Sequence, residues 1–186
     1  YRTAEQIKRT GSGESDLAKI ELLMNEVGID KDFNPAHAAA MLKEEVTGKP
    51  AGAMVLPDGS VVTGKTSELL GAASSLLLNA LKRVAGVDKE TYVVSDQALE
   101  PIGHLKTEHL HSKNPRLHSN ETLIALSISS ATNPEAEKVI EASYQLKGCD
   151  AYFSVIISAA DERTYRNLGI NVCCEPKFER GTFYHK

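Results

Sequence analysis

The run of residues 53–86 constrains the fold of this chain more than any other part of the sequence. Two short apolar segments, AMVL and SVVT, flank the tripeptide Pro57-Asp58-Gly59. Glycine in such a tripeptide supplies a positive φ at little steric cost, so the pattern predicts a β-hairpin. The long apolar segment SELLGAASSLLLNALKRVAG follows, and Thr66 or Ser67 can cap it as a helix. Its few polar positions predict that this helix is buried on a sheet.

Strand and helix patterns alternate after this helix. The segments TYVVS, AYFSVIIS and INVCCE are predicted strands, and the predicted helices cover residues 96–109, 121–131, 134–148 and 161–169. This alternation after a hairpin predicts a three-layer α/β fold, in which helices cover both faces of a mixed sheet. Before the hairpin, the sequence shows two amphipathic helices, opened by Ser15 and by Asn34-Pro35. We therefore expect a small helical subdomain over residues 1–50 and an α/β domain over residues 51–186.

Composition narrows the class of partner. The 186 residues are 41% hydrophobic, and a formal charge of -4 comes from 25 acidic and 21 basic residues spread along the chain. No basic field favours nucleic acid, and no apolar run of about 18 residues favours a membrane. Three cysteines, two of them adjacent, are a poor basis for disulfides and favour the reducing cytoplasm. Because the chain begins at Tyr1 without methionine, we expect a longer protein with an N-terminal remainder.

The segment GSVVTGKT, residues 59–66, has the spacing of a phosphate loop. In that interpretation Lys65 would hold the outer phosphates of a nucleotide and Thr66 a metal ion, with Asp96 or Asp161 as acidic partner. Val61 and Val62 favour an extended backbone instead, so the second strand of the hairpin is the better interpretation. Even then, Lys65 and Thr66 precede a helix start whose free N–H groups favour an anion. The alternative is a capped helix with a solvated lysine.

The segment HLKTEHLHSKNPRLHSN gathers four of the six histidines. Their spacing is poor for chelation on a helix, so no metal site is predicted, and the pattern identifies no cofactor. A polar pocket is a better interpretation, because Lys113, Asn114, Arg116 and His118 suit a phosphate or carboxylate. If the chain is an enzyme, His118 or His111 would act as acid or base while Arg116 holds the anion. The alternative is a surface loop shaped by Asn114 and the proline after it.

Several long segments together resemble a known family. They are VLPDGSVVTGKTSELLGAAS, LKTEHLHSKNPRLHSNETLIALSISSATNP, LKGCDAYFSVIIS and LGINVCCEP. In this order they resemble the C-terminal part of the bacterial family called domain of unknown function 1846, over most of residues 50–176. The resemblance implies a longer, cytosolic, oligomeric protein without an established activity. It also implies a cytidine-deaminase-like three-layer architecture.

The residues themselves give no support for deaminase chemistry. Zinc deaminases need a His or Cys ligand with Glu two residues later, and Pro-Cys-x-x-Cys. The Pro-Cys-x-x-Cys pattern does not occur in this chain, whose paired cysteines, Cys173 and Cys174, are adjacent. We therefore expect a domain that contributes to an anionic small-molecule site and to a homo-oligomer. A purely structural module and a phosphate-loop enzyme are the alternatives.

Overall fold

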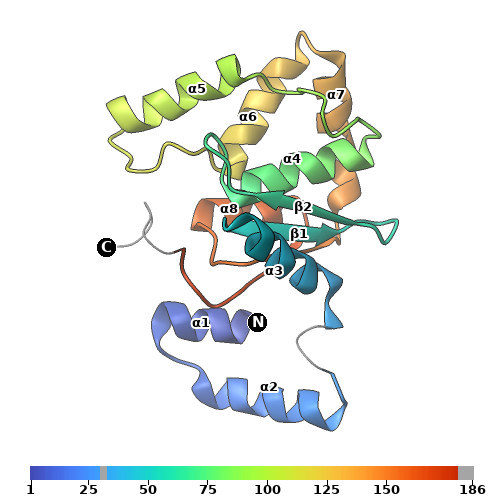
Figure 1. Cartoon of the computed structure of the whole chain (residues 1–186), viewed down its shortest axis with the longest axis vertical. Helices are drawn as coiled ribbons and strands as arrows, with labels where there is room; N and C mark the ends of the chain where they lie inside the picture. Colours follow the sequence, from blue (N-terminus) through green and yellow to red (C-terminus); the bar gives the residue numbers. More distant parts are fainter. Residues whose placement is uncertain (30–32, 180–186) are drawn as a thin grey trace.

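The computed structural model describes residues 1–29 and 33–179, and within them four strands form one mixed sheet. The sheet order is β2-β1-β3-β4, in which β1 is antiparallel to both neighbours and β3 is parallel to β4. The strands are β1 (Ala51–Val55), β2 (Val61–Lys65), β3 (Asp150–Phe153) and β4 (Asn171–Cys174). Helix α3 (Pro35–Thr47) packs on one face and α4 (Ala72–Val84) on the other (Figure 1). The predicted mixed sheet with helices on both faces is confirmed.

The predicted hairpin is formed by β1 and β2. Gly59 has φ 79°, and the side chain of Asp58 accepts hydrogen bonds from the backbone and the hydroxyl of Ser60, which closes the turn. Gly64 lies within β2 where α4 crosses the sheet. A Cβ at Gly64 would lie 2.2 Å from the backbone nitrogen of Leu76, so only glycine allows α4 to approach this closely.

Residues of the sheet alternate between two cores, as the period of a strand requires. Met54 and Phe153 belong to the larger cluster on the α4 side, and Ala53 and Tyr152 to the smaller cluster under α3. The adjacent cysteines divide in the same way. Cys174 packs in the larger cluster, whereas Cys173 packs against the smaller one. No disulfide joins the cysteines, since Cys149, Cys173 and Cys174 are free thiols.

The first fifty residues form α1 (Arg2–Thr10), α2 (Glu14–Glu26) and α3. Asn34 caps α3, because its side-chain oxygen accepts a hydrogen bond from the N–H of Ala36, as the sequence predicts. Ser15 does not cap α2, which begins at Glu14 after Gly13. No residue of α1 or α2 is buried, whereas α3 buries three residues on the sheet. The domain boundary at residue 50 stays a prediction.

Other helices also follow the hairpin: those of residues 96–141 lie beyond α4, seen from the sheet, and that of residues 159–167 lies beside the sheet (Figure 1). They are α5 (Asp96–His104), the π-helical turn η2 (Leu105–His109), α6 (Ser119–Ser130), α7 (Pro134–Glu141), the 3-10 turn η3 (Ala142–Leu146) and α8 (Ala159–Asn167). The four predicted helices in this part of the chain are confirmed. In the described ranges, no helix has the length and apolar character needed to cross a bilayer.

Three local predictions are wrong. The segment TYVVS forms no strand; Val93 and Val94 are buried in the larger cluster without joining the sheet. Of AYFSVIIS, only the part up to Phe153 is a strand, and the rest leads to α8. Helix α4 begins at Ala72, four or five residues later than expected. The cause is a turn in which the Ser67 hydroxyl accepts a hydrogen bond from the N–H of Leu70. The cytidine-deaminase-like architecture stays a prediction.

Candidate functional site

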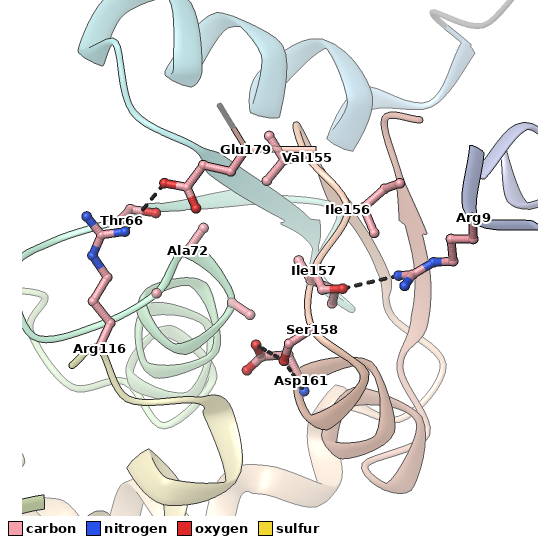
Figure 2. A pocket seen from close by; sticks show the side chains of 12 residues that line it. Arg9, Thr66, Ala72, Arg116, Val155, Ile156, Ile157, Ser158, Asp161 and Glu179 are labelled. Carbon is pink, nitrogen blue, oxygen red and sulfur yellow. Dashed lines mark hydrogen bonds and ion pairs between the residues drawn. The ribbon is translucent and has the colours of Figure 1, made fainter. Parts of the chain in front are cut away.

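A cavity of about 170 Å³ lies at the start of α4, between α4, the end of β3 and the start of α8 (Figure 2). Four segments that are far apart in the sequence meet there: α1, the residues after β2, the loop before α6, and the residues after β4. The side chains with polar or charged groups that line it are Arg9, Thr66, Arg116, Ser158, Asp161 and Glu179.

The loop before α6 reaches this cavity because it pairs with the turn before α4. Leu117, 1% exposed, forms a parallel bridge with Leu70, and its N–H donates to the carbonyl of Leu69. The carbonyl of Leu117 accepts from the hydroxyl of Ser74, in the first turn of α4. This pairing places Arg116 and His118, the two neighbours of Leu117, beside the start of α4.

A buried lysine fixes the same loop from the other side. Lys106 is 6% exposed, and its Nζ donates to the carbonyl of Arg116 over 2.6 Å and to Oε2 of Glu121 over 2.8 Å. Oε2 of Glu121 also accepts from the backbone N–H of His118 over 2.7 Å. Lys106 and Glu121 therefore hold the backbone of both Arg116 and His118. The position of the Arg116 side chain rests on this buried ion pair.

The start of α4 offers backbone donors to the cavity. Gly71, the N-cap residue, supplies no side-chain cap, and Ala72 and Ala73 line the cavity. The first N–H groups of a helix have no partner within the helix, and they lie at the positive end of its dipole. With Arg116 at the same cavity, this geometry suits an anion.

A carboxylate cluster forms one wall. Oδ1 of Asp161 accepts from the N–H and the hydroxyl of Ser119, both over 2.7 Å. Oδ2 accepts from the hydroxyl of Ser158 over 2.7 Å and lies 3.0 Å from Nδ1 of His118. Burial raises the pKa of Asp161, but the hydrogen bond and charge of His118, with the bonds from Ser158 and Ser119, outweigh it and lower this pKa below its usual value. Asp161 is therefore a fixed negative charge at neutral pH.

The same cluster does not form a nucleophile relay. Ser158 Oγ lies 3.2 Å from Nδ1 of His118, the ring nitrogen that also meets Asp161. A Ser-His-Asp relay needs the hydroxyl and the carboxylate on opposite ring nitrogens. Ser158 instead caps α8, since its Oγ accepts from the N–H of Asp161 over 3.1 Å.

A second, larger cavity adjoins the first. Its volume is about 470 Å³, and it shares Thr66, Arg116, Val155 and Glu179 with the first cavity. Its other charged lining residues are Glu44, Lys49 and Lys177. Arg116 Nη1 lies 3.4 Å from Oε1 of Glu179 where the two cavities meet.

The structure brings together only some of the predicted site residues. Thr66 and Arg116 line both cavities. His118 lines neither, but its Nδ1 lies 3.0 Å from Oδ2 of Asp161, which lines the first. Asn114 is buried and serves the loop, because its side-chain oxygen accepts from the N–H of Arg116. The remaining three, Lys65, His111 and Lys113, line neither cavity. Lys65 lines a separate cavity of about 320 Å³ together with Asp96.

Residues 59–66 do not form a phosphate loop. Gly59 closes the hairpin turn, and Val61–Lys65 pair with β1 through the register Gly52↔Gly64. A phosphate loop needs a flexible turn whose N–H groups surround the anion, and an extended strand offers no such cradle. The Gly-x-x-x-x-Gly-Lys-Thr spacing is therefore that of a hairpin strand, as its valines favour.

Four residues of the site escaped the sequence-based prediction, namely Arg9, Lys106, Ser158 and Glu179. Arg9 and Glu179 lie near opposite ends of the chain, so no spacing connects them with residues 66 or 116. Lys106 resembles the exposed lysines around it in sequence, and only the folded loop buries it. Ser158 precedes an acidic helix start, a pattern that predicts a cap.

Known proteins that match this chain have no stated activity. A family model described as "Domain of unknown function DUF1846, C-terminal" matches residues 32–184. A UPF0371 protein of Streptococcus pyogenes serotype M5 is 42% identical over 186 residues, which cover 100% of this chain and 38% of that relative. A UPF0371 protein of Corynebacterium efficiens is 44% identical over 169 residues, which cover 91% of this chain and 34% of that relative. The chain thus spans little more than a third of these relatives. The resemblance found in the sequence is confirmed: the chain belongs to the DUF1846 family and matches its C-terminal domain.

Proposed function

We propose that this domain binds a small anionic metabolite, carrying a phosphate or carboxylate group, in the cavity at the start of α4. The observation that carries the proposal is the convergence of Arg116 with a helix start that has no side-chain cap. The arginine offers a fork of N–H donors, and the helix start offers backbone donors at its positive end. Both groups lie on rigid elements, because α4 is buried and Lys106 fixes the loop.

The charges around the site decide how strong this binding can be. Two arginines, Arg9 and Arg116, and two carboxylates, Asp161 and Glu179, line the first cavity, so the formal charges of its lining balance. Asp161 is occupied by four hydrogen-bond donors of α6, α8 and His118, which leaves it less able to repel an anion. The acid or base of any reaction at this site would be His118, held by Asp161.

Calorimetric titration of the chain with inorganic phosphate tests the proposal. We expect saturable binding that Arg116→Gln weakens by about tenfold or more, as the loss of a charge-assisted hydrogen bond predicts. Arg163→Gln is the matched control, because Arg163 is exposed on α8 and does not line the cavity. Equal binding by both variants, or no phosphate binding by the unaltered chain, would contradict the proposal.

Assembly is the second candidate function, and the outer face of α3 favours it. Leu42 and Val46 are 60% and 76% exposed, one helical turn apart, on the helix whose opposite face packs on the sheet. An apolar pair of this kind on a fixed helix suits a contact with a second copy of the chain. We infer that this domain both holds the ligand and contributes to a homo-oligomer.

The layering supports a cytidine-deaminase-like architecture, which we retain as a proposal. The hairpin followed by a buried helix is present, with α3 on the opposite face of the sheet. Among the described residues, no group of three or more metal-ligating side chains lies together. The proposal therefore concerns the arrangement of layers and not zinc chemistry.

A further inference from the structure

The carboxylate of Glu179 forms an ion pair with Arg116 at the proposed anion site. Oε1 of Glu179 lies 3.4 Å from Nη1 of Arg116, and the two side chains are 14% and 21% exposed (Figure 2). Both residues line both cavities. The ion pair therefore lies where the two cavities meet.

This ion pair is a loose one. A charge-assisted N–H···O bond is usually about 2.7–2.9 Å long, and arginine binds a carboxylate best through two parallel bonds. The distance of 3.4 Å between Nη1 of Arg116 and Oε1 of Glu179 is longer than this range. Glu179 lies five residues after the end of β4, outside any described helix or strand. A ligand can therefore replace it at Arg116.

Replacement of Glu179 at Arg116 should be harder for a carboxylate ligand than for a phosphate ligand. A monocarboxylate ligand would replace one carboxylate by another, and it would compete with a tethered group whose effective concentration reaches millimolar values. A phosphate dianion carries more charge and three acceptor oxygens. It can contact Arg116 and the free N–H groups of Ala72 and Ala73 at once.

We propose that the ligand is a phosphate monoester whose phosphate displaces Glu179 from Arg116, with the rest of the ligand extending into the second cavity. This inference rests on the proposed anion-binding function and specifies its ligand class. The second cavity has room for a polar body, and its charged side chains include Lys49 and an ion pair of 2.6 Å between Lys177 and Glu44. Glu179 lines both cavities, so its displacement from Arg116 opens space on the side of Arg116 that faces them.

Titration of four proteins with inorganic phosphate and with acetate tests the inference. The proteins are the unaltered chain, Glu179→Gln, Arg116→Gln and Glu90→Gln, the last being a matched control at an exposed position outside both cavities. We expect the unaltered chain to bind phosphate and not acetate. Glu179→Gln should tighten phosphate binding about fivefold, since an ion pair of ordinary strength no longer competes. It should also make acetate binding measurable, while Glu90→Gln changes neither.

The possible failures are distinguishable. If Arg116→Gln abolishes phosphate binding but Glu179→Gln changes it less than twofold, the anion site stands and the role of Glu179 is wrong. Acetate binding by the unaltered chain as tight as phosphate binding would overturn the ligand class. If none of the folded variants binds phosphate, the anion-binding function itself fails, and melting curves establish that each variant is folded.

Discussion

Asp161 is the residue on which the geometry of the site depends most. Its two oxygens join α8 to the start of α6 through Ser119, Ser158 and His118. Buried carboxylates with this many donors hold their neighbours in fixed positions, since removing the charge leaves several donors without a strong acceptor.

The Asp161→Asn variant should lose about 2–3 kcal/mol of unfolding free energy at neutral pH, the usual effect of hydrogen bonds to a charged group. Because the folded-state pKa of Asp161 is depressed, its contribution is present above the unfolded pKa of about 3.9 and is lost as the pH falls through the folded value. The difference between the two proteins should therefore narrow below about pH 4.

Denaturant unfolding of the unaltered chain and of Asp161→Asn, measured between acidic and neutral pH, provides this comparison. Ser158→Ala serves as a control because it removes one donor to Asp161 and the cap of α8 but retains the carboxylate. A difference that does not vary with pH would show that Asp161 acts through packing and not through its charge.

At the same scale, the sequence predicted Thr66, Arg116 and His118 as site residues, and the fold places them near one another, but the sequence did not predict their surroundings. A histidine and an arginine in a long polar loop form a sequence pattern that suggests a binding pocket. The residues that complete the cavity come from positions 9, 158 and 179, and only the tertiary contacts of α1, α8 and the end of the chain place them there. Contacts between residues so far apart in the chain produce no recognisable sequence pattern.

Among the elements, helix α3 has two faces with different roles. One face buries Ala36, His37 and Ala40 on the sheet, and the other exposes Leu42 and Val46. In the proposed homo-oligomer, this exposed apolar pair would contact a second copy of the chain.

The double variant Leu42→Glu/Val46→Glu should therefore be a monomer at concentrations where the unaltered chain is a dimer, because two charges at the contact are costly to bury. Light scattering during size-exclusion chromatography measures the molar mass of each protein and so distinguishes monomer from dimer. The matched control is Ile124→Glu/Ile128→Glu, another exposed apolar pair one turn apart, on α6. A monomeric unaltered chain, or dissociation caused only by the α6 pair, would contradict the role of α3.

Element boundaries show where sequence patterns stop being informative. The hairpin and the helices of the second half follow from periodicity and caps, which act over a few residues. The segment TYVVS has strand composition, yet Val93 and Val94 are buried in the core without a neighbouring strand. The start of α4 depends on Leu69, Leu70 and Leu117, which are paired across nearly fifty positions. The Ser67 turn contributes locally to the start of α4, but the pairing with Leu117 is long-range and leaves no local pattern.

For the whole molecule, the sheet and its two helical layers determine where a ligand can bind. The cavity lies beside the start of α4 and the end of β3, where α1, α8 and the residues after β4 also meet (Figure 2). Composition and alternation predict these layers well, because a hydrophobic face on each element must be covered. They do not predict which loops meet at the edge of the sheet.

The most direct test of the central claim is a titration of the isotopically labelled chain with inorganic phosphate, followed by the backbone amide resonances. The unaltered chain should show saturable shifts at Ala72 and Ala73, which line the cavity in the first turn of α4, and at Arg116. In the Gly71→Asp variant these shifts should be suppressed, because the new carboxylate caps α4 in place of the anion. Gly71 has an extended backbone, φ -67° and ψ 164°, and an added Cβ would meet nothing closer than 3.7 Å, so the fold accommodates this change. Shifts confined to other regions, or equal shifts in both proteins, would contradict the assignment of an anion site to the start of α4.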